Sequence, residues 1–205
     1  MRLHLSCIVA LMILLPHGPV RGDGWDRLRE DAGLIKTIQA DFVQTKALKI
    51  LVAPLVSTGH FVFRAPGSVR WEYTSPVQVV TLVTPGRVQR FTHTDDLGWV
   101  PDSTGSLQAM QIVMEKITGW LSGNFIDDGL FNAELQEGPP IVVVLTPRDE
   151  AMARFLQRVE VVFSAVPGLV EVVRLHEGPG ATTTITFKQT HLNDDIPDAQ
   201  FKDVK

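Results

Sequence analysis

Cysteine is almost absent from this sequence of 205 residues: Cys7 is the single one, and it lies in the apolar N-terminal segment. Beyond that segment there is no thiol, which excludes a disulfide, a cysteine-ligated zinc and a cysteine nucleophile. Basic residues are also few: the sequence has 19 Lys and Arg and 23 Asp and Glu, which gives a net charge of -4. A nucleic-acid-binding protein would usually carry a basic stripe, so we expect no nucleic-acid partner.

The first 22 residues, Met1–Gly22, have the pattern of a secretory signal. Arg2 supplies the positive charge, an apolar run follows over Leu5–Leu15, and Gly22 marks a cleavage site. The alternative is a membrane anchor, but the run is about half the length that spans a bilayer. Cys7 lies too near the start to be a lipid-modified cysteine. We therefore expect export to the periplasm, with one domain over residues 23–205.

Catalytic and metal-binding motifs are missing as well. The sequence has no glycine-rich phosphate loop, no His-Glu-x-x-His motif and no Gly-x-Ser-x-Gly elbow. Paired acids such as Asp127-Asp128 lie in turn-like contexts, and the acidic stretch Asp194–Asp198 lacks the Gly and Glu of a calcium loop. The histidines outside the leader are isolated near strand ends: His60, His93, His176 and His191. We expect no catalytic residue, no metal and no cofactor, and so no enzyme.

Short alternating segments separated by turns predict a mainly β, α+β protein. A helix is expected over 25–35 and a short one over 149–155, where Pro147 and the acidic Asp149-Glu150 suit a helix start. Strands are expected over 37–50, 58–64, 68–74, 78–84, 87–93, 131–137, 141–146, 158–164, 170–176 and 182–191, with Trp99 in a loop or a further short strand. About ten antiparallel strands covered by helices on one side tend to curl around a cavity.

The most informative segment is the hairpin over Gly59–Tyr73. Pro66-Gly67 is expected to form its turn, with Gly67 in the left-handed conformation. Since side chains alternate along a strand, each strand presents one apolar face. These faces are Phe61, Phe63 and Ala65 on the first strand, and Val69, Trp71 and Tyr73 on the second.

Residues 105–123 switch to helical spacing and are apolar nearly all round. One stripe contains Leu107, Met110, Met114, Ile117 and Leu121, and Trp120 lies on the other side. Such a helix is buried on two sides or covers an apolar ligand, for which methionines are well suited. The candidate ligand-binding residues are Phe42, Phe61, Phe63, Trp71, Tyr73, Met110, Met114, Ile117 and Trp120. The alternative for each of them is plain core.

The hairpin, the early Ala40–Gln44 strand, Thr81–Val83 before a Pro-Gly turn, and Leu145–Arg148 together resemble the LolA family over roughly Trp25 to Phe201. These proteins are periplasmic carriers of lipoproteins in Gram-negative bacteria. The resemblance implies an open antiparallel half-barrel with a helical lid, whose cavity holds the acyl chains of lipoproteins. It also implies a monomer that takes cargo from an inner-membrane ABC transporter, passes it to an outer-membrane acceptor and uses no cofactor.

One position departs from the family pattern. In the family an arginine next to the hairpin proline links barrel and lid, whereas here Ala65 precedes Pro66 and Arg64 stands one residue earlier. We assign Arg64 to this barrel–lid contact by resemblance. However, a shift of one residue in a strand turns the side chain to the opposite face unless a bulge re-aims it. The alternative is that Arg64 points outward.

Two other classes of function stay open. The first is a module that senses lipids or lipoproteins on the same half-barrel, although such regulators usually carry a second domain. The second is a hydrolase or isomerase that uses the same cavity, for which the sequence shows no convergent nucleophile or acid–base set. An outer-membrane acceptor on this fold would need a lipidated cysteine at its mature N-terminus, and none is present.

Overall fold

The computed structural model describes residues 24–102, 116–125, 129–178 and 180–204. The expected leader, and the candidate residues Met110 and Met114, lie outside these residues. Within them, no helix is both long and apolar enough to span a membrane. The helices are α1 (Gly24–Gly33), α3 (Glu150–Ala153) and the 3-10 helix η1 (Asp198–Phe201), and residues 116–121 are also helical.

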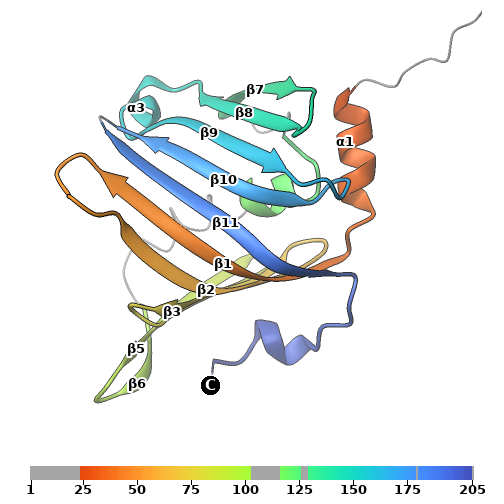
Figure 1. Cartoon of the computed structure of the whole chain (residues 1–205). Coiled ribbons are helices and arrows are strands. Elements are labelled where there is room, and N and C mark those ends of the chain that lie inside the picture. The colour runs from red at the N-terminus through yellow and green to blue at the C-terminus, as the bar shows by residue number, and fades with distance from the viewer. Residues whose placement is uncertain (1–23, 103–115, 126–128, 179, 205) are drawn as a thin grey trace, which may run out of the picture.

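Eleven strands form one open antiparallel sheet (Figure 1). The first six are β1 (Thr37–Leu48), β2 (Leu55–Arg64), β3 (Ser68–Ser75), β4 (Val79–Thr84), β5 (Arg87–Thr94) and β6 (Gly98–Pro101). The other five are β7 (Phe131–Gln136), β8 (Val142–Pro147), β9 (Leu156–Phe163), β10 (Val170–Glu177) and β11 (Ala181–Leu192). The order across the sheet is β6-β5-β4-β3-β2-β1-β11-β10-β9-β8-β7. The prediction of an open antiparallel sheet is confirmed, and Trp99 lies in a further short strand, β6.

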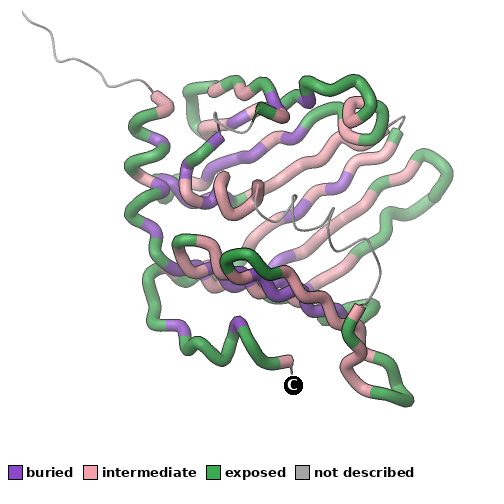
Figure 2. Tube along the Cα trace, turned by 180° about the vertical axis from the view of Figure 1, so that it is seen from behind, coloured by how far each residue is buried: buried purple, intermediate pink, exposed green. Residues whose placement is uncertain are grey.

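Alternation decides which side chains are buried in several strands: more buried and less buried residues alternate along β7 and β8, and Figure 2 colours each described residue by its burial. In β1, Ile38, Ala40 and Phe42 all enter the main hydrophobic core. The two hairpin faces predicted for β2 and β3 also pack in or against this core. The period of two in the sequence therefore gives the correct inner face of these strands.

The turn between β2 and β3 differs from the prediction. Gly67 is not among the residues with positive φ, so its expected left-handed conformation is wrong. The Ala65–Pro66 peptide bond is cis instead. A cis bond before proline reverses the chain without a positive φ, which leaves Gly67 in an ordinary conformation.

The chain must cross the sheet between β6 and β7, because these strands form its opposite edges. Helical residues 116–121 lie on this connection, over the inner face (Figure 1). Behind them Phe125 is fully buried, with ring centroids 6.3 Å from Trp25 in α1 and 6.0 Å from Phe163 in β9. The segment that covers the inner face is thus packed, through Phe125, against both α1 and the sheet.

Helix α1 closes one end of the sheet. Its buried residues are Leu28 and Ala32, which lie one turn apart on one side. Gly168, with φ of +73°, touches this helix, because an added Cβ would lie 2.5 Å from the backbone nitrogen of Ala32. A side chain at residue 168 would therefore push α1 away from the sheet.

Candidate functional site

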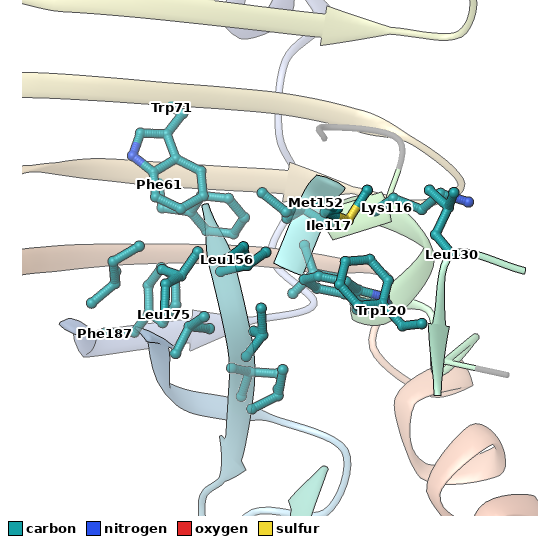
Figure 3. Close-up of a pocket in the computed structure, with 17 residues that line it drawn as sticks. Phe61, Trp71, Lys116, Ile117, Trp120, Leu130, Met152, Leu156, Leu175 and Phe187 are labelled. Atoms are coloured by element: carbon teal, nitrogen blue, oxygen red, sulfur yellow. The ribbon is translucent and has the colours of Figure 1, made fainter. Parts of the chain in front are cut away.

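An apolar cavity of about 280 Å³ lies between the inner face of the sheet and residues 116–121 (Figure 3). This volume is close to the lower end of small-molecule sites, about 300–1,000 Å³. Lys116 is the single charged residue among the described residues that line it. The remaining lining residues are Phe61, Trp71, Ile117, Trp120, Leu121, Leu130, Phe131, Met152, Leu156, Val159, Val161, Val170, Val173, Leu175, Ile185 and Phe187.

Strand alternation explains why this wall is apolar while the outer face is charged. On β9, Val159 and Val161 line the cavity, and the alternate residues Arg158 and Glu160 form an ion pair with a distance of 2.8 Å. The wall can therefore exclude water from an apolar ligand, because it offers few groups that bind water. Among the described residues, no group of three or more His, Cys, Asp or Glu side chains is placed to hold a metal ion.

Four of the candidate binding residues line the cavity: Phe61, Trp71, Ile117 and Trp120. Phe42 and Phe63 are not among the lining residues, and both pack within the main hydrophobic core. Tyr73 lines a neighbouring pocket instead. Met110 and Met114 lie outside the described residues.

The part of the wall that β9, β10 and β11 contribute is not among the predicted ligand-binding residues. Val173 and Leu175 on β10, and Ile185 and Phe187 on β11, each stand two residues apart. This spacing is the same signal that identifies the hairpin faces, so it was available in the sequence. What the spacing does not show is which inward residues face open space.

An aromatic cluster supports the cavity wall at Trp71. Ring centroids lie 5.4 Å apart for Phe42 and Trp71, 5.2 Å for Phe61 and Trp71, and 5.1 Å for Phe42 and Tyr73. Gly59 makes room for this cluster, because an added Cβ would lie 2.7 Å from Cζ of Phe42 and overlap the carbonyl oxygen of Glu72. The position of Trp71 therefore depends on the absence of a side chain at residue 59.

Two indole nitrogens in the wall are buried without a hydrogen-bond partner among the described residues: Nε1 of Trp71 and Nε1 of Trp120. A buried donor left without an acceptor costs about 1–3 kcal/mol. Trp120 packs edge-to-face on Phe131, with the ring centroids 5.9 Å apart. Both nitrogens are donors only, and the Trp71 indole lies close enough to Tyr73 to oppose part of the rise in the Tyr73 pKa that burial causes.

Arg64 points to the outer face and contacts the C-terminal segment. Its guanidinium donates to the carbonyl oxygen of Ile196 at 3.1 Å, pairs with Asp198 at 2.8 Å and lies 4.7 Å from the ring centroid of Phe201. The expected barrel–lid contact is therefore not seen in its described contacts. The physical reason is strand parity, since Arg64 follows the inward Phe63 and shares the outer face with Val62, which clusters with Ile196 and Phe201.

Solved structures of similar fold include a DUF1329 family protein from Desulfovibrio piger, with a TM-score of 0.51 and 10% identity over 87% of this chain and 95% of that one. A chain of the Pseudomonas aeruginosa MucA/MucB complex has a TM-score of 0.47 and 17% identity, over 88% of this chain and 60% of that one. A LolA superfamily protein from Nitrosomonas europaea has a TM-score of 0.44 and 12% identity, over 89% of this chain and 99% of that one.

No curated protein sequence matches this chain. The sequence family of the outer membrane lipoprotein carrier protein LolA matches residues 34–203, which include every strand of the sheet and the described lining residues of the cavity. By this match the chain belongs to the LolA family.

Proposed function

We propose that this protein is a periplasmic carrier, not an enzyme, that binds the acyl chains of lipoproteins and shuttles them from the inner to the outer membrane. The observation that carries this proposal is the apolar cavity under residues 116–121, in a chain that belongs to the LolA family. Members of this family are lipoprotein carriers of the periplasm, and the expectation of an exported chain fits that compartment.

The physical reason for such a carrier lies in the cost of exposing acyl chains to water. Each buried methylene contributes about 0.8 kcal/mol, so a lipoprotein cannot cross an aqueous compartment unless its chains are shielded. The cavity wall is apolar and nearly free of charge, so it would select acyl chains without selecting the polypeptide attached to them. One carrier could then serve lipoproteins of different sequence.

Release also has a structural basis in this proposal. The sheet is open, and residues 116–121, which cover the cavity, belong to the connection between β6 and β7 and not to the sheet itself. A ligand could therefore leave when the cover moves, without breaking the hydrogen bonds of the sheet. The proposed partners are an inner-membrane ABC transporter that loads the carrier and an outer-membrane acceptor that unloads it, and no cofactor is required.

Native mass spectrometry of the protein tests the binding step. The protein is expressed to the periplasm, purified without detergent and mixed with a synthetic triacylated lipopeptide or with the same peptide lacking acyl chains. We expect one acylated peptide to bind per chain and the unacylated peptide not to bind. No mass shift with the acylated peptide would overturn the proposal.

A second measurement tests shuttling separately. Spheroplasts of a Gram-negative cell that make a labelled lipoprotein are incubated with the purified protein, and the supernatant is assayed for a soluble complex. Release of the lipoprotein supports the carrier role. Binding of the lipopeptide without release would favour a module that senses lipoproteins and would contradict shuttling.

A further inference from the structure

Large hydrophobic side chains that are exposed gather at one end of the sheet. Among the described residues there are ten of them, and only Leu34 and Val166 lie at the end where α1 packs. The other eight lie at the opposite end, in or beside the turns found there: Ile50, Leu51, Val52, Leu55, Val56, Val77, Leu97 and Phe155. Apolar residues that cluster in this way on a surface mark an interaction site.

Five of the eight belong to the connection between β1 and β2, together with the first two residues of β2. We call these five the apolar tip: Ile50, Leu51, Val52, Leu55 and Val56. Figure 1 shows this connection at the end of the sheet away from α1. The tip is anchored at its base, because the backbone N–H of Lys49 donates to the carbonyl oxygen of Gly180, before β11, at 3.2 Å.

The exposure of the tip suits a lipid layer better than a groove on a protein. Ile50, Leu51 and Val52 are consecutive, so their side chains leave the backbone in different directions. Ile50 is 88% exposed, and Val52 is fully exposed. A groove would cover one side of such a tip and leave its other sides in water, whereas a lipid layer surrounds it on all sides.

The charges beside the tip complement a surface that carries phosphate groups. The sequence has no acidic residue between Asp41 and Glu72, whereas Lys46 and Lys49 lie shortly before the tip. Lys46 is paired with Glu177 at 2.6 Å, and Lys49 directly precedes the tip. An apolar tip with a cation at its base matches the interface of anionic phospholipids, where acyl chains lie beneath the phosphates.

A further exposed ring, that of Phe155, lies close to the tip. The carbonyl oxygen of Phe155 accepts the backbone N–H of Gly178 at 3.1 Å. The connection between β10 and β11 contains both Gly178 and Gly180, and Gly180 is the residue that binds Lys49. This connection therefore lies between Phe155 and the base of the tip.

Charge decides which of the other exposed residues join the tip. Residues 148–154, before Phe155, carry two acidic and two basic side chains, so this segment has no net charge. Leu97 instead follows Asp95 and Asp96, and an anionic surface repels these acids. The docking surface is therefore the apolar tip with Phe155, and Lys49 supplies its positive charge.

We propose that the apolar tip and Phe155 dock the protein on the surface of a bilayer that contains anionic phospholipids. The apolar side chains enter the layer below the headgroups, and Lys49 lies level with the phosphates. None of these residues is among the described residues that line the apolar cavity. The inference therefore goes beyond the proposed function, and it does not depend on what the cavity holds.

Sedimentation with vesicles tests this docking. The purified protein is mixed with vesicles of phosphatidylethanolamine and phosphatidylglycerol, and the bound fraction is measured. Val52→Asn is compared with the control Leu34→Asn, which removes an exposed apolar side chain at the opposite end of the sheet. We expect the control to bind like the wild type and Val52→Asn to bind about tenfold more weakly, because burial of one such side chain strengthens binding by about that factor.

Three results would overturn the inference. These are no binding by the wild type, equal binding by Val52→Asn and the wild type, and an equal loss in Leu34→Asn. A wild-type dimer that Val52→Asn converts to a monomer, with no binding to vesicles, would assign the tip to a contact between copies of the chain instead. All of these results leave the proposed function standing, because the lipopeptide measurement tests the cavity separately.

A label at residue 52 shows whether the tip enters the lipid. Beyond the expected leader the sequence has no cysteine, so in the exported protein Val52→Cys provides one labelling site. The fluorescence of a nitrobenzoxadiazole label there should rise when vesicles are added, because the dye moves into an apolar layer. The same label at Leu34→Cys should not respond. An unchanged signal at residue 52 on vesicles that bind the protein would contradict the inference.

Discussion

Replacing Val173 with Phe tests whether the cavity under residues 116–121 is where an acyl chain binds. Val173 lies near the middle of the wall, because its neighbours across β9 and β11 are Val161 and Ile185, and all three line the cavity. A phenyl ring at this position would project into the space that the ligand needs. The change adds about four carbon atoms to the wall. These atoms occupy the space that about four methylenes of the ligand would otherwise fill.

The expected magnitude follows from this exchange. At about 0.8 kcal/mol for each methylene that loses its place, the variant should bind an acyl ligand about 3 kcal/mol more weakly. Since about 1.4 kcal/mol corresponds to a factor of ten, the dissociation constant should rise about 100-fold. The stability of the ligand-free protein should not fall, because a cavity of about 280 Å³ gives the ring room.

Displacement of the fluorescent probe 1-aminoanthracene by the acyl ester methyl dodecanoate measures the loss of affinity. Urea unfolding measures the stability. The control is Val172→Phe, because Val172 is the next residue on β10 and does not line the cavity. We expect this control to bind the ester like the wild type. Equal binding by Val173→Phe and the wild type would refute the reasoning, and an equal loss in both variants would indicate a distorted sheet instead of a blocked cavity.

Three further predictions concern stability, each measured by urea unfolding. Gly59→Ala should lose about 1–3 kcal/mol of stability, because the added Cβ has no space. In Gly67→Ala the added Cβ meets nothing within 4 Å, so this variant should keep the stability of the wild type. Equal urea midpoints for the two variants would contradict this prediction. Asp149→Ala should lose about 1 kcal/mol of stability, because Oδ1 of Asp149 caps α3 by accepting the backbone N–H of Met152 at 2.9 Å. An unchanged urea midpoint would show that this cap does not stabilise the protein. The Arg64 hydrogen bond lowers the pKa of Asp198, so its contribution to stability is present at neutral pH and is lost as the pH falls through that lowered pKa. Asp198→Asn should therefore be less stable than the wild type at pH 7, and a difference in stability that does not shrink as the pH is lowered into the acid range would contradict this.

The sequence predicts those parts of the fold that depend on local periodicity. The faces of β2 and β3 follow from alternation, and the start of α3 follows from Pro147 and the acidic Asp149-Glu150, although the helix is shorter than expected. The turn at Pro66 could not be settled in this way. A Pro-Gly pair suits several turn types, so the pair alone does not determine which turn forms.

The site was only partly predictable, for a different reason. Alternation distinguishes inward from outward residues, but a cavity exists where two facing layers fail to fill the space between them. Phe63 and Val173 are both inward in pattern, yet Phe63 is fully packed and Val173 borders the cavity. The contacts of Ile196 and Phe201 with the outer face were also missed, because two isolated apolar residues in a polar segment have no period.

The position of β1 beside β11 has a consequence for folding kinetics. Read across the sheet, the strands run from β7 to β11 and then from β1 to β6, which is a cyclic permutation of their order in the chain. The pairing of β1 with β11, from Ile38 opposite Leu192 onward, therefore closes a loop of nearly the whole domain. Such a closure is entropically costly and slow. A circular permutant that begins at β7 and ends at β6 would pair every strand with its neighbour in sequence, and it should fold faster than the natural chain.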